Sequence, residues 1–334
     1  PSAAERDEKE EFPAEAVRKL GALGFMGMMV PPEYGGSGLD MVSYVLAIEE
    51  ISKVDASCGV IMSVNNSLVC YGLDRWGSAP QKEKYLRELA TGRKLGAFAL
   101  SEPEAGTKNF ITNGSNADIV LVMAATDRSK GANGVCTFIV DKGTPGFSVA
   151  KKERKLGIRS SDTVSLAFQE CFVPAENRIG EEGFGFKFAM KTLDGGRIGI
   201  AAQALGIAMA SRDASVRYSK QRKAFGQYLA EFQAIQFKIA DMATKIEAAQ
   251  MLTMKAAALK DSDKPFAHYA AMAKLYASRV AVECALEAIQ IHGGYGYIKE
   301  YTVERYLRDA KITEIYEGTS EVQRIVISRT LLKN

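Results

Sequence analysis

The segment that offers acid–base chemistry most directly is residues 315–321, which read Ile-Tyr-Glu-Gly-Thr-Ser-Glu. A glycine directly after Glu317 frees the backbone for close approach to a ligand. Thr319 or Ser320 could cap a helix over residues 321–332, and the first N–H groups of that helix could then hold an anion. In an apolar setting the Glu317 carboxylate could act as a general base. The alternative is a capped surface helix with a solvated Glu317.

Two small-residue segments could contact a nucleotide. Residues 101–107, Ser-Glu-Pro-Glu-Ala-Gly-Thr, follow a predicted strand and would suit a phosphate or flavin, with a surface turn as the alternative. Residues 293–296, Gly-Gly-Tyr-Gly, follow a predicted helix and could admit a nucleotide, with a helix C-cap as the alternative. Neither is GxGxxG after a strand, so no Rossmann fold is indicated.

Charged residues mark two further segments. Arg222 and Phe225 combine a phosphate-binding fork with an aromatic ring, and the alternative is a solvated helix end. Asp194 and Arg197 lie near a helix start, where an i,i+3 ion pair is the alternative to ligand binding. The remaining acidic residues of these motifs are interpreted as solvated or capping groups: Glu102, Glu104 and Glu321.

Composition bounds the class of protein. The chain has 334 residues, and 43 Lys and Arg against 40 Asp and Glu give a net charge of +3, which argues against a dedicated nucleic-acid binder. A hydrophobic content of 47% excludes a disordered chain, and the length predicts two or three domains. With only two histidines, His268 and His292, no metal centre is expected.

The cysteines, the apolar runs and the start of the chain bear on its cellular location. The 5 cysteines are odd in number and form no CxxC pair, which predicts free thiols in a reducing compartment. No apolar run is expected to reach the roughly 20 residues that a membrane span needs. The charged start of the chain is not typical of a signal or transit peptide.

Periodicity divides the chain into three blocks. Helical spacing predicts an N-terminal helical domain over residues 1–95, with helices at 41–53, at 57–68 after a cap at Asp55, and at 80–90. Short β-rich runs at 96–100, 118–125, 135–140, 147–150 and 163–168 predict a small antiparallel barrel or sandwich over residues 96–180. Long amphipathic segments over residues 181–334 predict a C-terminal four-helix bundle, so the fold class is mainly α with a central β-domain.

Taken together, these segments resemble the acyl-CoA dehydrogenase family, and most closely its short-chain, butyryl-CoA members. The resemblance covers nearly the whole chain. It rests on ordered motifs, of which the main ones are residues 30–36, 59–68, 100–107, 111–113, 155–159, 192–206 and 308–321.

The resemblance implies a fold, a cofactor and a reaction. FAD is expected between the β-domain and the bundle, in a homotetramer built as a dimer of dimers. By family likeness Glu317 is the base that removes the α-proton of an acyl-CoA thioester, while the β-hydrogen leaves as hydride to flavin N5. Other relatives carry the base within the segment that matches residues 194–197, where this chain has Gly196.

The same likeness implies binding residues. Substrate contacts are expected from Thr107, Asp194, Arg197 and Gly318. FAD contacts are expected from Phe98, Leu100, Ser101, Gly106, Thr107, Phe110, Ile111, Thr112, Phe225, Gly293, Thr319, Ser320 and Glu321. Further FAD contacts, which the adjacent subunit could supply, are expected from Arg222, Gln233, Gln290 and Gly294.

Two departures from the family pattern stand out. Phe110 occupies a position where relatives often have Trp, so it can cover a flavin face but donates no indole N–H. Thr107 runs directly into Lys108, where relatives insert two strands of roughly 15–20 residues in total by strand length. Because the flanks still match the family, we expect a missing segment there and a Cα separation much larger than the ~3.8 Å of adjacent residues. A normal peptide bond would instead mean a shortened relative.

The leading hypothesis is an FAD-dependent short-chain acyl-CoA dehydrogenase that passes electrons to an electron-transfer flavoprotein. The same site run in reverse as an enoyl-CoA reductase is the alternative. Two further classes are a DNA-associated relative, whose basic C-terminal extension is not seen before Asn334, and a flavin oxidase, which typically uses Asp where this chain has Glu317. No nucleic-acid or membrane partner is expected, and the location would be the cytoplasm of a bacterium or the mitochondrial matrix of a eukaryote.

Overall fold

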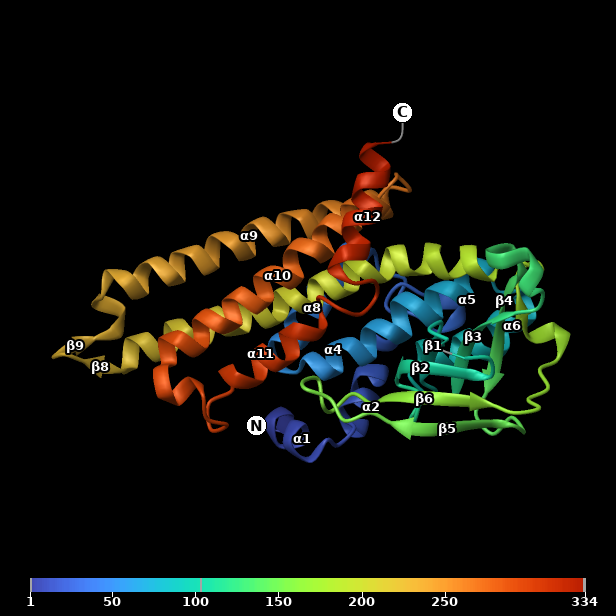
Figure 1. Cartoon of the computed structure of the whole chain (residues 1–334), viewed down its shortest axis with the longest axis horizontal. Helices are drawn as coiled ribbons and strands as arrows, with labels where there is room; N and C mark the ends of the chain where they lie inside the picture. The colour runs from blue at the N-terminus through green and yellow to red at the C-terminus, as the bar shows by residue number, and fades with distance from the viewer. Residues whose placement is uncertain (1, 103, 333–334) are drawn as a thin grey trace.

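A computed structural model describes residues 2–102 and 104–332; Pro103 of the 101–107 motif and the chain ends at Pro1 and Asn334 lie outside this part. N-terminal helices and a β-domain lie against one end of a set of long C-terminal helices (Figure 1). The predicted fold class, mainly α with a central β-domain, is confirmed.

The N-terminal part is helical. Its elements are α1 (Ser2–Lys9), α2 (Ala14–Ala22), η1 (Phe25–Gly27), η2 (Pro32–Tyr34), α3 (Met41–Val54), α4 (Ala56–Ser63), η3 (Val64–Cys70), α5 (Tyr71–Trp76), α6 (Ala79–Gln81), η4 (Lys82–Leu86) and α7 (Arg87–Ala90). The cap predicted at Asp55 is confirmed, since its side chain accepts hydrogen bonds from the N–H groups of Ser57 and Cys58 at 2.9 and 3.1 Å.

Helices α4, η3 and α5 form one continuous apolar run, Ala56–Trp76. By length and composition this run could cross a membrane, so the expectation that no apolar run reaches such a length is wrong. In the fold 94% of its apolar window is buried against the rest of the protein, as in the core helix of a globular protein. Its position at the centre makes it one wall of the cavity described below.

Two sheets form the β-domain. One has the order β1-β3-β4-β7 and the other β2-β6-β5. The strands are β1 (Gly96–Ala99), β2 (Thr107–Thr112), β3 (Ile119–Ala125), β4 (Val135–Asp141), β5 (Phe147–Lys152), β6 (Thr163–Phe168) and β7 (Arg178–Ile179), with the short helices η5 (Arg128–Gly134) and η6 (Ala175–Asn177). Apolar residues from both sheets, among them Val120, Ile111 and Val164, share one core between them.

The sheets correct three details of the sequence analysis. β1 pairs with β3 in parallel, so the β-domain is not purely antiparallel. The strand order within the described residues is that of an open two-sheet sandwich, not a closed barrel. β2 was not predicted, because its burial runs against its polarity: Lys108 is buried, whereas Phe110 is exposed.

The expected break between Thr107 and Lys108 is not found. Both residues belong to β2 and pair with consecutive residues of β6, Ala167 and Leu166. The expectation of a large Cα separation is therefore wrong. A turn directly precedes the strand, since the Thr107 N–H donates to the Glu104 carbonyl at 3.2 Å.

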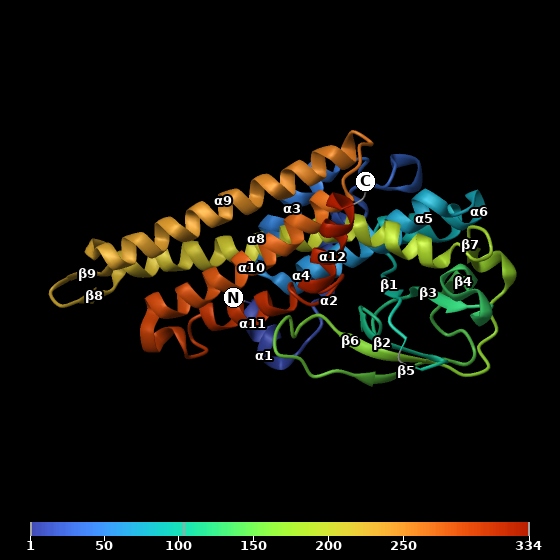
Figure 2. The same cartoon turned by 45° about the horizontal axis from the view of Figure 1, so that its top comes forward.

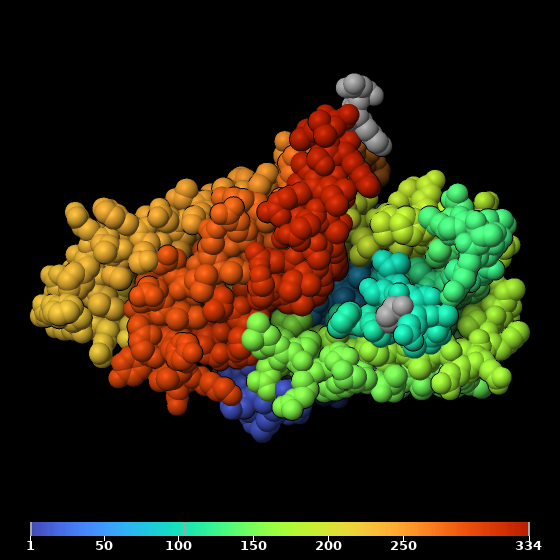
Figure 3. Space-filling model, in the orientation of Figure 1, coloured from blue at the N-terminus to red at the C-terminus, as the bar shows by residue number. Residues whose placement is uncertain are grey.

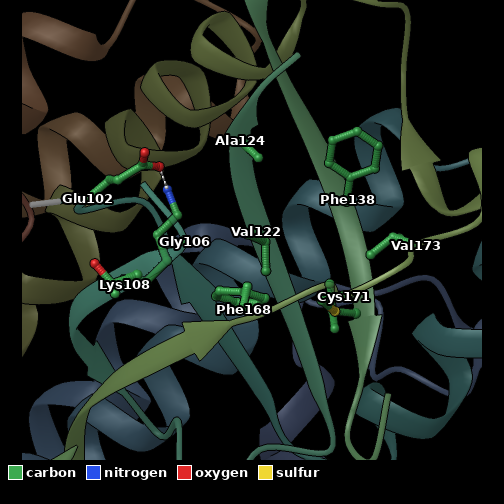
Figure 4. Close-up of a pocket in the computed structure, with 11 residues that line it drawn as sticks. Glu102, Gly106, Lys108, Val122, Ala124, Phe138, Phe168, Cys171 and Val173 are labelled. Carbon is green, nitrogen blue, oxygen red and sulfur yellow. Dashed lines mark hydrogen bonds and ion pairs between the residues drawn. The ribbon is translucent and has the colours of Figure 1, made fainter. Parts of the chain in front are cut away.

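A groove of about 300 Å³ lies beside this junction, and we call it the seam groove (Figure 4). Glu102 and Lys108 form an ion pair of 2.8 Å at its rim. Its lining is otherwise mainly apolar: Gly106, Thr107, Val122, Ala124, Phe138, Val140, Phe168, Cys171 and Val173. Apolar side chains of both sheets are thus exposed in this groove.

The C-terminal part is dominated by three long helices that lie side by side (Figures 1 and 2). Its elements are α8 (Gly185–Gln221), β8 (Lys223–Ala224), β9 (Gln227–Tyr228), η7 (Leu229–Glu231), α9 (Gln233–Asp261), α10 (Ala267–His292), η8 (Gly293–Gly296), α11 (Val303–Ile312) and α12 (Ser320–Leu331). Within α9, Met242, Ile246 and Ala249 are buried, while Ile235 and Ile239 are only partly buried.

The loop between β5 and β6 docks the β-domain on the bundle. A Cβ on Gly157 would lie 2.1 Å from the Arg308 carbonyl oxygen, so only glycine allows this approach. The Ile158 N–H donates to the buried Asp309 carboxylate of α11, at 2.5 Å. Two motifs of the family resemblance, 155–159 and 308–311, therefore touch and fix the relative position of the two domains.

Candidate active site

A cavity of about 690 Å³, which we call the Glu317 cavity, opens between the β-domain, the central helix run and α11–α12. This volume lies within the roughly 300–1,000 Å³ typical of ligand sites. Its lining is largely apolar: Val60, Val64, Leu68, Phe98, Leu100, Ser101, Phe110, Ile111, Thr112, residues 153–158, Thr163, Leu193, Arg308, Lys311, Ile312, Ile315, Tyr316, Glu317, Gly318, Thr319 and Val322.

Glu317 brings an unpaired carboxylate to this cavity. Within the described residues, both of its side-chain oxygens are buried and neither has a hydrogen-bond partner. Burial raises the pKa of Glu317 to about 7, against the opposing pull of the positive charges on Lys274 and Arg197. A carboxylate that binds a proton near neutral pH can serve as a general base there.

The backbone around Glu317 is unusual. Glu317 has a φ of 52° and Gly318 a φ of 91°, so two successive residues adopt left-handed conformations. Such strain persists only where the surrounding structure enforces it, and it is frequent at functional sites. Within the described residues the Glu317 N–H donates to no protein acceptor, so it is free to bind a ligand oxygen.

Gly196 of α8 makes the room for this carboxylate. A Cβ added to Gly196 would lie 2.1 Å from Oε2 of Glu317 and 2.8 Å from Cδ2 of Leu68. Any side chain at position 196 would therefore displace the Glu317 carboxylate.

The helix that follows the loop begins as predicted. Thr319 is the N-cap of α12, and its hydroxyl accepts a 3.4 Å hydrogen bond from the Val322 N–H. Ser320 anchors the same turn, since its N–H donates to the Glu314 carbonyl at 3.0 Å. Glu321 is exposed and pairs with Arg324, which agrees with its interpretation as a surface residue.

The lining of the Glu317 cavity contains the first group of predicted FAD residues. Phe98, Leu100, Ser101, Phe110, Ile111 and Thr112 all line the cavity. Phe110 has a φ of 59° and is 72% exposed, so a large ring is held out on a strained backbone. Apolar side chains, the hydroxyl-bearing residues Ser101 and Thr112 and an unpaired carboxylate thus line one cavity, and this combination fits the isoalloxazine ring of FAD.

A second group of predicted FAD residues lies elsewhere. Arg222, Gly293 and Gly294 line a separate pocket of about 480 Å³, which we call the Arg222 pocket. The Arg222 guanidinium lies 5.3 Å from the ring centre of Tyr295. This pocket is at the end of the bundle that carries β8 and β9, away from the β-domain (Figures 1 and 2). The structure therefore does not bring these residues to Glu317 within one chain.

The remaining predicted residues are scattered. Phe225 is 97% exposed, and Gln233 and Gln290 are also on the surface. Gly106 and Thr107 line the seam groove and not the Glu317 cavity.

Asp194 and Arg197 form the i,i+3 ion pair that the sequence allowed as the alternative, and neither side chain lines the Glu317 cavity. Burial raises the pKa of Asp194, although the Arg197 charge opposes this. Neither residue thus shows the exposed polar face expected of a ligand contact within this chain.

Sequence reasoning missed three residues around the base. The Tyr316 hydroxyl donates to Gln203 of α8, and Gln323 and Lys274 hold the main chain of the loop. For Lys274 the sequence does contain a clue, because this lysine stands among the alanines of an Ala-rich segment, at helical spacing from Ala270 and Ala277. Within the described residues, no group of three or more His, Cys, Asp or Glu side chains could hold a metal ion.

Comparison with known proteins gives a consistent result. Models of the acyl-CoA dehydrogenase N-terminal, middle and C-terminal domains match residues 1–93, 88–171 and 183–332. Similar curated proteins come from bacteria and from mammalian mitochondria. Among them, the short-chain specific acyl-CoA dehydrogenase of Clostridium acetobutylicum is 50% identical and covers 100% of this chain and 93% of its own. That alignment spans 354 positions against 334 residues here, so the relative carries residues that this chain lacks.

Solved structures agree with this. Butyryl-CoA dehydrogenase from Megasphaera elsdenii superposes with a TM-score of 0.98 at 50% identity, over 100% of this chain and 94% of its own. A chain from a structure described as the electron transferring flavoprotein of Acidaminococcus fermentans also gives a TM-score of 0.98 at 50% identity, over 100% of this chain and 93% of its own.

Proposed function

The chain belongs to the acyl-CoA dehydrogenase family, and we propose that it catalyses FAD-dependent α,β-dehydrogenation of short-chain acyl-CoA thioesters to trans-2-enoyl-CoA. The predictions of the family, of an oxidoreductase and of FAD as its cofactor are confirmed. The observation that carries the proposal is the buried, unpaired carboxylate of Glu317 in the wall of a largely apolar cavity.

Glu317 is the base in this proposal. Its carboxylate takes the α-proton of the thioester, and bound FAD would accept the β-hydrogen with its electron pair, which leaves a C=C bond in the product. The unpartnered N–H of Glu317 can donate to the thioester oxygen and so stabilise the negative charge that develops there. The pKa of about 7 makes Glu317 a stronger base than an ordinary carboxylate while it stays largely ionised in mildly alkaline solution.

The other binding roles remain proposals that follow from family membership. Phe98, Phe110 and Thr112 would hold the flavin of the same chain, where they line the Glu317 cavity. Gly318, next to the base, would contact the acyl-CoA. The substrate roles of Thr107, Asp194 and Arg197 have weaker support, because none of their side chains lines that cavity.

Oligomerisation would give the Arg222 pocket a role. Arg222 and Gly294 lie far from the Glu317 cavity of their own chain, so they could contact FAD only in a neighbouring subunit. We therefore propose a homotetramer, a dimer of dimers, in which each FAD lies between two chains. We propose domain boundaries at residues 95/96 and 180/181. The proposed electron acceptor is an electron-transfer flavoprotein, and the proposed location is the cytoplasm of a bacterium or the mitochondrial matrix of a eukaryote.

Flavin bleaching tests the proposal. Butyryl-CoA added to the FAD-loaded protein without oxygen should reduce the flavin and abolish its visible absorbance, and a C4 to C8 series should show the fastest reduction at the short end. Re-oxidation of the reduced protein by an enoyl-CoA would show that the site also runs in reverse. An FAD-loaded protein that stays oxidised with every acyl-CoA would refute the proposal.

A further inference from the structure

Lys274 is an anomaly in the bundle. It lies on α10 (Ala267–His292), and its side chain is 0% exposed, among the largest fully buried side chains of the protein. Its neighbours at helical spacing, Ala270, Ala277 and Ser278, are also buried. A buried ammonium is costly unless hydrogen bonds or an opposite charge compensate it, so Lys274 must have specific partners.

The partner is the loop that carries the base. Lys274 Nζ donates to the Gly318 carbonyl at 2.8 Å. The same carbonyl accepts a second bond from Gln323 Nε2 at 2.8 Å, and this Nε2 also lies 3.2 Å from the Glu317 carbonyl. Donors from α10 and α12 thus converge on the two peptides whose left-handed conformations aim the Glu317 side chain.

Electrostatic interactions also connect Lys274 with the Glu317 loop. Four ionisable side chains act on the Glu317 site from different elements: Lys274 on α10, Arg197 on α8, Tyr44 on α3 and Tyr316 on the loop itself. Arg197 already has Asp194 as a partner, whereas Lys274 has no carboxylate within ion-pair distance among the described residues. Glu317, and more weakly Glu314 and Glu321, oppose the burial that lowers the pKa of Lys274 to about 8.

We propose that Lys274 is a positioning residue for the catalytic base: it holds the Gly318 carbonyl, and with it the Glu317 loop, and it places the main uncompensated positive charge beside the carboxylate. This inference rests on the proposed function, because it gives Lys274 a role only if Glu317 is the base. It extends that function because the pH range of the reaction would then depend on Lys274 of α10 as well as on the Glu317 loop.

The first test compares Lys274→Met with the wild type across pH in the anaerobic reduction by saturating butyryl-CoA. Methionine has a similar length but neither charge nor donor. Without the nearby charge the carboxylate holds its proton more tightly, so the acid limb of the rate profile should move to higher pH. The rate at pH 7 should fall by about fivefold, which is the effect of a one-unit rise from a pKa of about 7, with FAD content and KM changed much less than kcat.

Two other variants separate position from charge. Gln323→Leu removes the second donor to the Gly318 carbonyl but no charge, so kcat should fall while the acid limb stays in place. Lys260→Met is the matched control, because Lys260 is a largely buried lysine of α9 over the ring of Tyr71 and makes no contact with the loop. It should lose stability without any shift of the pH profile.

Thermal midpoints give a readout that does not depend on turnover. Lys274→Met should lower the midpoint of the wild type more than that of the Glu317→Gln variant, because the negative charge that attracts Lys274 is already absent in the second case. A Lys274→Met protein that bleaches with the wild-type pH profile would overturn the inference while the proposed function stands. Failure of the wild type itself to bleach would overturn the proposed function instead.

Discussion

A Cβ on Gly196 would lie 2.1 Å from Oε2 of Glu317, so the two positions cannot both carry a side chain without rearrangement. α8 approaches the loop before α12 so closely that the glycine is a condition for the observed carboxylate position. This gives a physical reason for the departure noted in the sequence, where relatives with the base on this helix have a carboxylate in place of Gly196. A side chain at position 196 is thus incompatible with the observed position of the Glu317 carboxylate.

Gly196→Ala should therefore reduce turnover more than it reduces stability. The added methyl group must push the Glu317 carboxylate away from its place, and misplacement of a positioned base should cost about 10²-fold or more in kcat. Stopped-flow flavin reduction measures this. Gly195→Ala is the control, because its added Cβ would meet only the flexible end of Lys260, at 3.1 Å. Equal rates for the two variants would show that the contact with Glu317 has no catalytic consequence.

Glu317→Gln should keep FAD and lose at least about 10²–10⁴-fold in turnover, the usual contribution of a positioned general base. Glutamine has nearly the same shape but cannot accept the α-proton. Flavin content from the visible spectrum and rate from anaerobic reduction by butyryl-CoA are the two measurements. A variant that retains both FAD and wild-type rates would remove Glu317 from the catalytic role.

The same substitution should stabilise the protein in a pH-dependent way. Folding raises the pKa of Glu317 from 4.5 to about 7. Below pH 4.5 this group therefore does not reduce the free energy of unfolding. As pH rises from 4.5 through 7 that free energy falls, because the unfolded chain is ionised while the folded chain still holds the proton. The gain in thermal midpoint from Glu317→Gln should thus be small at pH 5 and larger at pH 8. Glutamine also removes the negative charge that attracts Lys274, so the comparison is best made in the Lys274→Met background. A gain that is independent of pH would contradict the raised pKa.

The sequence predicts a strand well where its apolar residues are the buried ones, and poorly where a charged residue is buried and an apolar one is exposed. Val164 and Leu166 of β6 are apolar and buried, and the strand has the bounds that its pattern predicts, Thr163–Phe168. β2 was missed because its pattern is inverted: Lys108 is inside, paired with Glu102, and Phe110 is outside. An ion pair between residues on either side of a turn cannot be read from period-two alternation.

The site shows the same limit. The helix start at Thr319 and the candidate base Glu317 belong to one local motif; Thr319 is the N-cap that the motif predicts, and Glu317 lines the cavity. Lys274 acts on the loop from 44 residues before Gly318, through a hydrogen bond that no local pattern encodes. Arg222 and Gly294 lie together as the family resemblance implies, but their distance from Glu317 became visible only in the fold.

Arg222→Ala should weaken FAD retention and the oligomer. An Arg fork beside a pyrophosphate makes charge-assisted hydrogen bonds, which an exposed arginine in water does not gain. The flavin-to-protein ratio and the elution volume after gel filtration at low protein concentration measure both effects. Lys220→Ala is the control, as it removes an exposed cation from the last turn of α8. Unchanged flavin content and oligomer size for Arg222→Ala would show that it is a solvated surface residue stacked on Tyr295.

Insertion of a two-stranded segment between Thr107 and Lys108 should raise the stability of the protein. The seam groove exposes apolar side chains of both sheets, and β2 is an edge strand of the β2-β6-β5 sheet, so a hairpin placed here could cover both. Burial contributes about 25 cal/mol per Å² of apolar surface, so covering even 100 Å² would contribute about 2.5 kcal/mol. The thermal midpoint and the aggregation rate by light scattering are the measurements, with the segment taken from the Clostridium acetobutylicum relative. A Gly/Ser insert of equal length is the control, since it adds loop entropy without covering the groove. If the two inserts lower the midpoint equally, the groove is not a surface that a hairpin can cover.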